Sequence, residues 1–165
     1  MAYGEVVTNA GPLIYLSVLQ RFELLKRLFD RVDIPEAVFN EVAVQGVGLP
    51  GADETHAAVR SGWLHLTQVQ NRIAVDALLN ELDLGEVEAI VLTRELNLQR
   101  VLLDDGLARA KAQSMGLRVT GTIGILMLAK KSGIDVDLKH DLDVLLRSNF
   151  RLSRDLYDRV IATTP

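Results

Sequence analysis

The sequence contains no cysteine, which excludes a disulfide framework and any zinc site built on thiolates. Its three histidines, His56, His65 and His140, lie too far apart in sequence to form a local metal-binding motif. No uninterrupted apolar run reaches the roughly 18 residues that predict a membrane-spanning helix, and the first residues lack the basic and apolar segments of a secretion signal. The prediction is a cytoplasmic protein with no membrane contact.

The chain also lacks an excess of positive charge. Its formal net charge is −4, whereas a passive nucleic-acid binder is usually basic, because neutralising phosphates supplies most of its non-specific affinity. This counts against a simple DNA- or RNA-binding module. It counts less against a metal-dependent nuclease, whose site must be acidic to hold divalent cations that then offset the charge of the substrate.

Apolar residues, in contrast, are abundant. They make up 48% of the 165 residues, which is enough to build a hydrophobic core and argues against disorder. No internal repeat, linker or change of composition divides the chain. A single domain over residues 1–165 is therefore predicted.

Short apolar runs alternate along the chain with segments of helical periodicity. The runs predict strands over residues 5–8, 32–34, 64–67, 100–103 and 118–120. The periodic segments predict helices over residues 22–29, 36–42, 54–61 and 106–115, and mainly helix beyond Thr122. This alternation favours a three-layer α/β/α domain with a mainly parallel sheet.

Oxygen-bearing side chains gather near the predicted carboxyl ends of these strands, where open parallel sheets bind ligands. The candidates are Asn9, Glu41, Glu86, Glu88, Asp104, Asp105, Thr120 and Thr122. Carboxylate and amide oxygens are the ligands preferred by Mg²⁺ and Mn²⁺. One or two such ions can activate water for the hydrolysis of a phosphodiester.

Five segments resemble, in order, the motifs of the PIN-domain family, in a branch close to VapC-type toxins. They are residues 7–14 (VTNAGPLI), 34–35 with 41–42 (IP and EV), 84–90 (LGEVEAI), 102–105 (LLDD), and 119–122 with 150–153 (VTGT and FRLS). The sequence departs from the family pattern at Asn9, where an acid is usual. The resemblance covers nearly the whole chain.

The resemblance implies a PIN-like metal-dependent endoribonuclease that cleaves single-stranded RNA as the toxin of a toxin–antitoxin pair. It implies Mg²⁺ or Mn²⁺ as cofactor, a cognate antitoxin as partner, and a homodimer. The implied metal ligands are Glu41, Asp104 and one of Glu86 and Glu88, with Asn9 and Asp105 beside them and Thr120 and Thr122 in support.

Each candidate also has a structural interpretation. Asn9 before Gly11 is a common turn or cap residue, and Glu41 lies on a helix where a solvated Glu is ordinary. The spacing Asp83-x-x-Glu86 fits a capping box, and a carboxylate at Glu88 suits the start of a helix whatever its role. The sequence does not decide which of these two glutamates is the ligand.

Asp104 and Asp105 before Gly106 fit a turn with a helix cap. Adjacent carboxylates after an apolar strand repel each other, however, unless they are solvated or bridged by a cation, which favours metal binding.

Two other functions compete with the nuclease. The amide of Asn9 brings no negative charge to the site. A second hypothesis is therefore a catalytically silent PIN-like binding module. A receiver-like phosphoacceptor ranks last, because its acidic pair would follow an early strand and a Lys would follow a late one.

Two surfaces are also predicted. Apolar residues on the first two helices exceed what these helices can bury against a sheet and predict a surface for a second copy or an antitoxin: Leu13, Ile14, Leu16, Phe22 and Leu25. Basic residues that can border the crevice and hold RNA phosphates are Arg94, Arg100, Arg109, Lys111, Arg118, Lys130 and Lys131.

Overall fold

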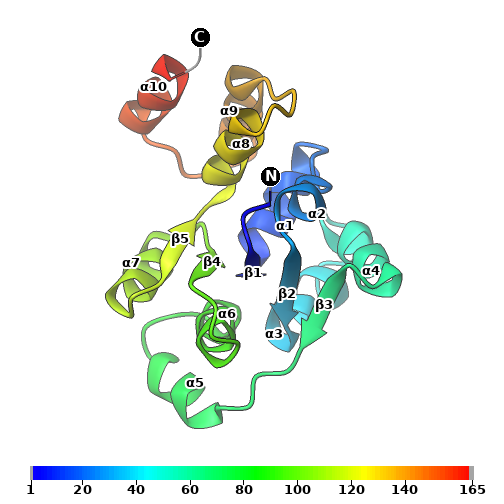
Figure 1. The fold of residues 1–165 in the computed structure, drawn as a ribbon, viewed down its shortest axis with the longest axis vertical. Helices are drawn as coiled ribbons and strands as arrows, with labels where there is room; N and C mark the ends of the chain where they lie inside the picture. Colours follow the sequence, from blue (N-terminus) through cyan, green and yellow to red (C-terminus); the bar gives the residue numbers. More distant parts are fainter. Residues whose placement is uncertain (1, 164–165) are drawn as a thin grey trace.

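The computed structural model describes residues 2–163, which contain one five-stranded sheet (Figure 1). Every strand pair is parallel, and the strand order is β3-β2-β1-β4-β5. The strands are β1 (Glu5–Thr8), β2 (Arg31–Pro35), β3 (Leu64–Thr67), β4 (Arg100–Leu102) and β5 (Arg118–Thr120). All five predicted strands are present, with boundaries that differ by at most one residue at either end.

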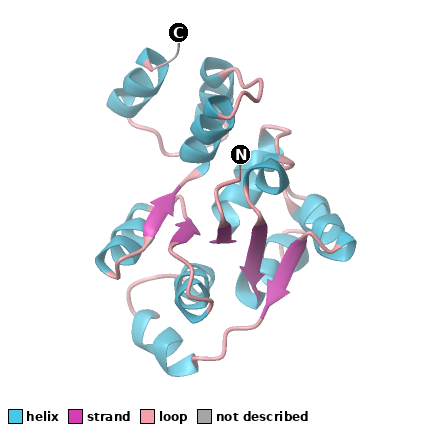
Figure 2. Ribbon diagram, viewed as in Figure 1, coloured by secondary structure: helices cyan, strands magenta, loops and turns pink. Residues whose placement is uncertain are grey.

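Helices connect the strands and cover both faces of the sheet (Figure 2). They are α1 (Ala10–Val18), α2 (Leu24–Leu28), α3 (Glu36–Phe39), the π-helical turn η1 (Asn40–Val44), α4 (Ala52–Ser61), α5 (Arg72–Leu78), α6 (Leu84–Glu95), α7 (Gly106–Ser114), α8 (Thr122–Lys131), α9 (Leu138–Arg147) and α10 (Arg154–Ala162). The predicted three-layer α/β/α class is confirmed. No helix within residues 2–163 is both long and apolar enough to cross a membrane.

The central strand β1 contributes to a core on each face of the sheet. Val6 belongs to a core shared with α1, α2, α4, α8 and α9, and Val7 to a second core shared with α5, α6 and α7. Both valines have no exposed surface, because successive side chains of a strand point to opposite faces and both faces are covered. Leu102 and Val101 on β4 divide between the two cores in the same way.

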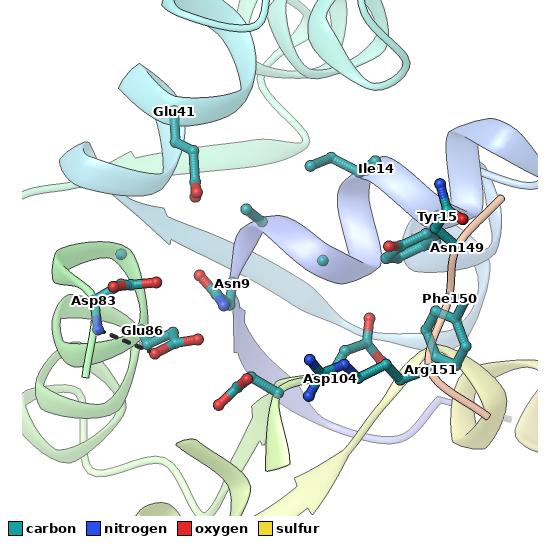
Figure 3. Close-up of a pocket in the computed structure, with 14 residues that line it drawn as sticks. Asn9, Ile14, Tyr15, Glu41, Asp83, Glu86, Asp104, Asn149, Phe150 and Arg151 are labelled. Atoms are coloured by element: carbon teal, nitrogen blue, oxygen red, sulfur yellow. Dashed lines mark hydrogen bonds between the residues drawn. The ribbon is translucent and has the colours of Figure 1, made fainter. Parts of the chain in front are cut away.

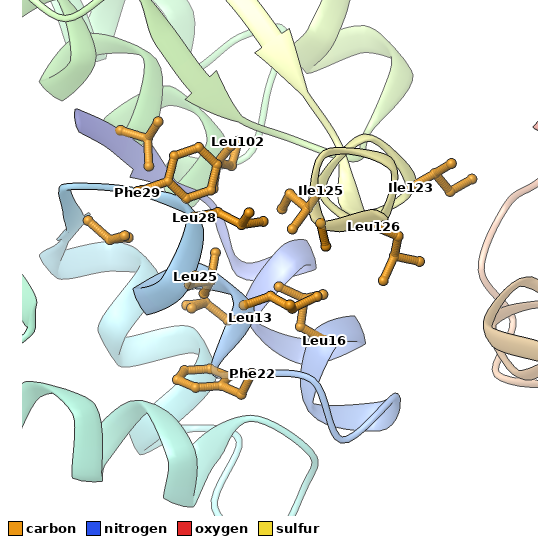
Figure 4. Packing of buried hydrophobic residues seen from close by; sticks show 14 of the residues in the cluster. Leu13, Leu16, Phe22, Leu25, Leu28, Phe29, Leu102, Ile123, Ile125 and Leu126 are labelled. Carbon is orange, nitrogen blue, oxygen red and sulfur yellow. The ribbon is translucent and has the colours of Figure 1, made fainter. Parts of the chain in front are cut away.

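The prediction of an exposed apolar surface on the first two helices is wrong. Leu13, Leu16 and Leu25 have no exposed surface, and Phe22 is 7% exposed; only Ile14 is half-buried. Figure 4 shows the four buried side chains in one cluster with Ile125 and Leu126 of α8. The prediction considered only the first two helices and a sheet, whereas α8, which follows them by about a hundred residues, also packs against them.

The strand order places a topological switch point between β1 and β4. The chain winds from β1 outward to β2 and β3, then returns to the other side of β1 for β4 and β5. Connections from the two strands therefore diverge and leave a crevice beyond their carboxyl ends. Asn9 follows β1 and Asp104 follows β4, and the backbone N–H of Asn9 donates to the carbonyl of Leu102 at 3.0 Å.

Candidate functional site

A pocket of about 350 Å³ opens beyond the carboxyl ends of β1 and β4 (Figure 3). Its lining includes the amide of Asn9 and five carboxylates, those of Glu41, Asp83, Glu86, Asp104 and Asp105. The structure thus brings together residues that are far apart in the sequence, including most of the predicted site residues. Glu88 and Thr120 are not among the residues that line this pocket, and neither is Thr122, which contacts Asp104 from behind.

Asp104 is held by the start of α8. The backbone N–H of Thr122 donates to its Oδ1 and the Thr122 hydroxyl donates to its Oδ2, both at 2.7 Å. Burial raises the pKa of Asp104, while these two bonds and the charge of Arg109 act in the opposite direction. The carboxylate is therefore fixed in orientation and retains further lone pairs that can face a ligand.

Glycines at two positions let the chain approach this carboxylate closely. A Cβ at Gly11 would lie 2.8 Å from Asp104 Oδ2, and one at Gly121 would lie 2.8 Å from Oδ1 and 2.7 Å from Arg109 Nη1. Any side chain at either position would force Asp104 to move. The absence of a Cβ is therefore what allows the backbone to pack against Asp104 on both sides.

Asn9 presents an amide oxygen with no partner. The residue is 8% exposed, and its Oδ1 is buried without a hydrogen bond to any residue within 2–163. Although it stands at the N-cap of α1, its side chain does not cap the helix. A buried, unsatisfied oxygen carries a free-energy cost of about 1–3 kcal/mol, which a bound cation or donor would remove.

Glu41 reaches the same region from the π-helical turn η1. A Cβ at Gly85 would lie 3.3 Å from both Glu41 Oε2 and Asn9 Oδ1, so the bare backbone of Gly85 leaves room for both oxygens. The enclosing protein raises the pKa of Glu41, with a smaller contribution from the charge of Asp83. Short π-helical turns within helices are frequent at functional sites.

Glu86 has the capping role weighed from the sequence, and it also lies at the pocket. Its Oε2 accepts a hydrogen bond from the backbone N–H of Asp83 at 3.1 Å, which is the glutamate half of a capping box, and its side chain also lines the pocket. Burial raises its pKa, the Asp83 bond lowers it, and the charges of Asp105, Asp83 and Glu41 raise it further.

Glu88 has a different environment. It is 5% exposed, its Oε1 accepts the backbone N–H of Ala37 at 3.0 Å, and its Oε2 pairs with Arg72 at 2.7 Å. These contacts join α6 to the start of α3 and to α5, and they place Glu88 outside the pocket. The two glutamates are two residues apart on a helix, so they point in different directions.

Two further predicted residues have local structural contacts. Asp105 lies at the rim and caps α7, accepting the backbone N–H of Ala108 at 3.0 Å. The Thr120 hydroxyl accepts a hydrogen bond from Arg100 at 2.7 Å and faces a neighbouring hollow. Of the basic residues predicted to border the crevice, Arg100 and Arg109 line that hollow.

The donor set suits a hard divalent cation. Asn9, Glu41, Glu86 and Asp104 offer only oxygen, and one of these oxygens is buried and unpartnered. Within residues 2–163, no three acidic or histidine side chains stand close enough together to form a finished ion site. Carboxylates that face one another repel, so closer approach requires a cation between them.

The arrangement has a known counterpart among protein families. A family model described as a PIN domain matches residues 5–164. The chain belongs to the PIN-domain family. No curated protein matches the chain at a significant level.

PIN domains are generally nucleases and typically use divalent metals, so this chain has a nuclease-like fold of a family that acts on nucleic acid. In this PIN domain the pocket lies beyond the carboxyl ends of β1 and β4, which is where open parallel sheets bind their ligands.

Several pocket residues were not predicted as functional from the sequence. Ile14, Tyr15, Asn149, Phe150 and Arg151 also line the wall. Phe150 and Arg151 belong to the C-terminal segment that contributes to the family resemblance, which was the available signal. Phe150 and Arg151 line the pocket because the loop between α9 and α10 lies over it in the tertiary structure.

Proposed function

We propose that this PIN domain is a divalent-metal-dependent endonuclease that hydrolyses single-stranded RNA. The observation that supports the proposal most directly is the buried, unpartnered Oδ1 of Asn9 in a pocket with the carboxylates of Glu41, Glu86 and Asp104. A bound cation would satisfy this oxygen and would also offset the charge of the three acids, whose charged forms are disfavoured by burial.

In the proposed reaction, Asp104, Glu41, Glu86 and Asn9 would hold Mg²⁺ or Mn²⁺ through oxygen. Such an ion would supply positive charge that favours hydrolysis of a phosphodiester and offsets the negative charge of the strand. Thr122 fixes the orientation of the Asp104 carboxylate by donating to both of its oxygens.

Glu86 is proposed as a ligand through one of its oxygens. Its Oε2 is engaged by Asp83, whereas its Oε1 has no hydrogen-bond partner within residues 2–163. Oε1 is therefore the oxygen of Glu86 that would contact the ion.

Purified protein tests the activity. We expect cleavage of a single-stranded RNA with Mg²⁺ or Mn²⁺, and loss of cleavage in EDTA that returns when the metal is restored. Asp104→Asn should abolish cleavage, while Asp53→Asn, an exposed acid on α4, should cleave like the parent. Equal cleavage by the Asp104 and Asp53 variants would refute the proposal.

A catalytically silent binding module is the second candidate. The observation that favours it is the amide of Asn9, which leaves the pocket with one carboxylate fewer than the family pattern. Metal affinity separates the two candidates, because a silent module should bind Mn²⁺ no more tightly than the Asp104→Asn variant does.

The motifs that resemble VapC-type toxins support a further part of the proposal, a toxin restrained by an antitoxin, acting in the cytoplasm as a homodimer. Induced expression should arrest growth unless a cognate antitoxin is co-expressed, and Asp104→Asn should remove the arrest. Light scattering of the purified protein measures the oligomeric state directly.

A further inference from the structure

A second hollow of about 500 Å³ lies against the candidate site. It is bordered by β5, the start of α8 and the loop between α9 and α10. Asp104, Phe150 and Arg151 line both hollows. Because they share these three residues, the two hollows are neighbours.

The charges of the two hollows are opposite. Of the residues that the structure describes, the first hollow is lined by five carboxylates and a single basic residue, Arg151. Among described residues, the second contains three guanidinium groups, those of Arg100, Arg109 and Arg151, and Asp104 is its single acid. Such a boundary between acidic and basic surface suits a substrate whose reacting phosphate lies on a cation and whose next phosphates lie on arginines.

Two of these arginines are fixed by the protein. Arg100 donates to the Thr120 hydroxyl at 2.7 Å, and Arg109 donates to the carbonyl of Leu103 at 3.1 Å. Each bond uses one of the five N–H donors of a guanidinium, so most donors remain for an anion. Neither arginine forms an ion pair with a carboxylate of residues 2–163.

Arg151 has no hydrogen bond or ion pair with any residue in 2–163. In contrast, the nearby Arg154 and Arg159 pair with acids on their own helix. In Figure 3 the Arg151 side chain extends from its loop toward Asp104, and the residue lines both hollows. An unpaired, solvated guanidinium beside an acidic pocket is available to bind a phosphate in the bidentate manner that arginine favours.

Packing holds the loop that carries Arg151. Asn149 adopts a left-handed conformation with φ of 63°, which ends the turn after α9. The backbone N–H of Phe150 then donates to the carbonyl of Leu145 at 3.1 Å. The Phe150 ring packs edge-to-face on the ring of Tyr15, with 4.8 Å between the ring centroids. The aromatic ring is half-buried and borders both hollows, so it offers surface for a base to stack on.

We infer that Phe150 and Arg151 form a nucleotide-binding site for the residue of a single-stranded nucleic acid next to the scissile phosphate. Arg151 binds the backbone phosphate, Phe150 stacks on the base, and Arg109 and Arg100 continue the phosphate track into the second hollow. The inference rests on the proposed nuclease function. Stacking on Phe150 requires a base that is free of a partner strand, so duplexes are excluded from this site.

Binding measured without metal tests this site independently of cleavage. Fluorescence anisotropy in EDTA would follow a short labelled RNA of mixed sequence, the same sequence as DNA, and its duplex. Arg151→Ala should weaken RNA binding about tenfold and lower the slope of log affinity against log salt by about one phosphate contact. Arg147→Ala is the matched control, because it removes an exposed positive charge four residues away that lines neither hollow.

The aromatic contribution has its own variant. Phe150→Leu keeps an apolar side chain against Tyr15 but removes the ring, and it should weaken single-strand binding about fivefold or more with little change in the salt slope. Thermal unfolding of each variant establishes that the fold is intact. Arg151→Lys should restore the salt slope but only part of the affinity, because it keeps the charge and loses the fork of donors.

The outcomes separate this inference from the proposed function. If the parent binds single strands and Arg151→Ala binds like Arg147→Ala, the nucleotide site is refuted while the cleavage test with Asp104→Asn still decides the nuclease. If the parent binds the duplex as tightly as the single strand, the stacking role of Phe150 is refuted. If the parent binds no nucleic acid in EDTA, the nucleotide site is refuted, while the cleavage test with metal still decides the nuclease.

Discussion

Thr122 contacts Asp104 twice, donating its backbone N–H to Oδ1 and its hydroxyl to Oδ2, each at 2.7 Å. Thr122 has no exposed surface, whereas Asp104 is half-buried at the pocket. The end of β5 thereby fixes the orientation of a carboxylate that follows β4. This contact between neighbouring strand ends organises the acidic pocket.

Replacing Thr122 with Val should disturb Asp104 without removing it. The backbone bond stays, but Oδ2 loses its donor, so the unfolding free energy should fall by about 1–3 kcal/mol. Mn²⁺ affinity should fall as well, because the carboxylate is less well oriented. Denaturant unfolding and calorimetry measure the two effects. Thr122→Ser keeps the hydroxyl and should retain Mn²⁺ affinity; an equal loss in both variants would show that the methyl group matters instead.

Glu86 and Glu88 should separate ligand binding from stability. Glu86→Gln should lower Mn²⁺ affinity tenfold or more with a small effect on stability, because Glu86 lines the pocket. Glu88→Gln should leave Mn²⁺ affinity unchanged and cost about 1–2 kcal/mol of unfolding free energy, because a buried hydrogen-bonded charge is lost opposite a more exposed Arg72. Calorimetry and denaturant unfolding on both variants measure this contrast. The reverse result would make Glu88 the ligand.

Restoring an acid at position 9 should strengthen metal binding. Asn9→Asp adds a negative charge near Glu41, and its attraction to a divalent ion at close range is on the order of several kcal/mol before solvation offsets most of it. We expect Mn²⁺ affinity at least tenfold higher and faster cleavage. In EDTA the same variant should be less stable than the parent, since like charges then repel.

The control for this variant is Asn9→Ala, which removes the oxygen altogether and should weaken Mn²⁺ binding. Thermal unfolding with and without Mn²⁺ shows whether Asn9→Asp is less stable than the parent without the ion and more stable with it. If Asn9→Asp leaves Mn²⁺ affinity unchanged, the silent binding module is favoured over the nuclease.

The pH dependence of stability should reveal the raised pKa of Glu86. Burial is the main cause of the rise, so the folded protein binds this proton more tightly than the unfolded chain does. The stabilising contribution is fully present below the ordinary glutamate pKa of about 4.3 and is lost as pH rises through the raised value. Mn²⁺ affinity should have the opposite pH dependence and increase with pH, because Glu86 must lose its proton to bind the ion.

Denaturant unfolding in EDTA at several pH values above about 4 measures this effect. Glu86→Gln should gain stability relative to the parent as pH rises, because glutamine has no charged form to desolvate. The exposed Glu23→Gln controls for the loss of one charge. A stability difference between parent and Glu86→Gln that does not change with pH would contradict the prediction.

The sequence by itself determined the fold class and the order of its elements. Residues 5–8, 64–67 and 118–120 are strands with the predicted boundaries, because short runs with apolar and β-branched residues between turn signals favour strands. Asn9 and Asp104 were placed at strand ends for the same local reason. Parallel strands all end on one side of the sheet, so local pattern alone brought these two residues to one edge.

Tertiary structure decided what depends on direction and on distant partners. Which of Glu86 and Glu88 faces the pocket depends on how α6 is rotated against α3 and the sheet. The sequence does not predict this rotation, because the two side chains are identical. The burial of Leu13 and Leu16 depends on α8, which the sequence supplies only much later. Arg151 reaches the pocket because the loop after α9 folds back over it, and nothing local to Phe150 and Arg151 encodes which strand end that loop will meet.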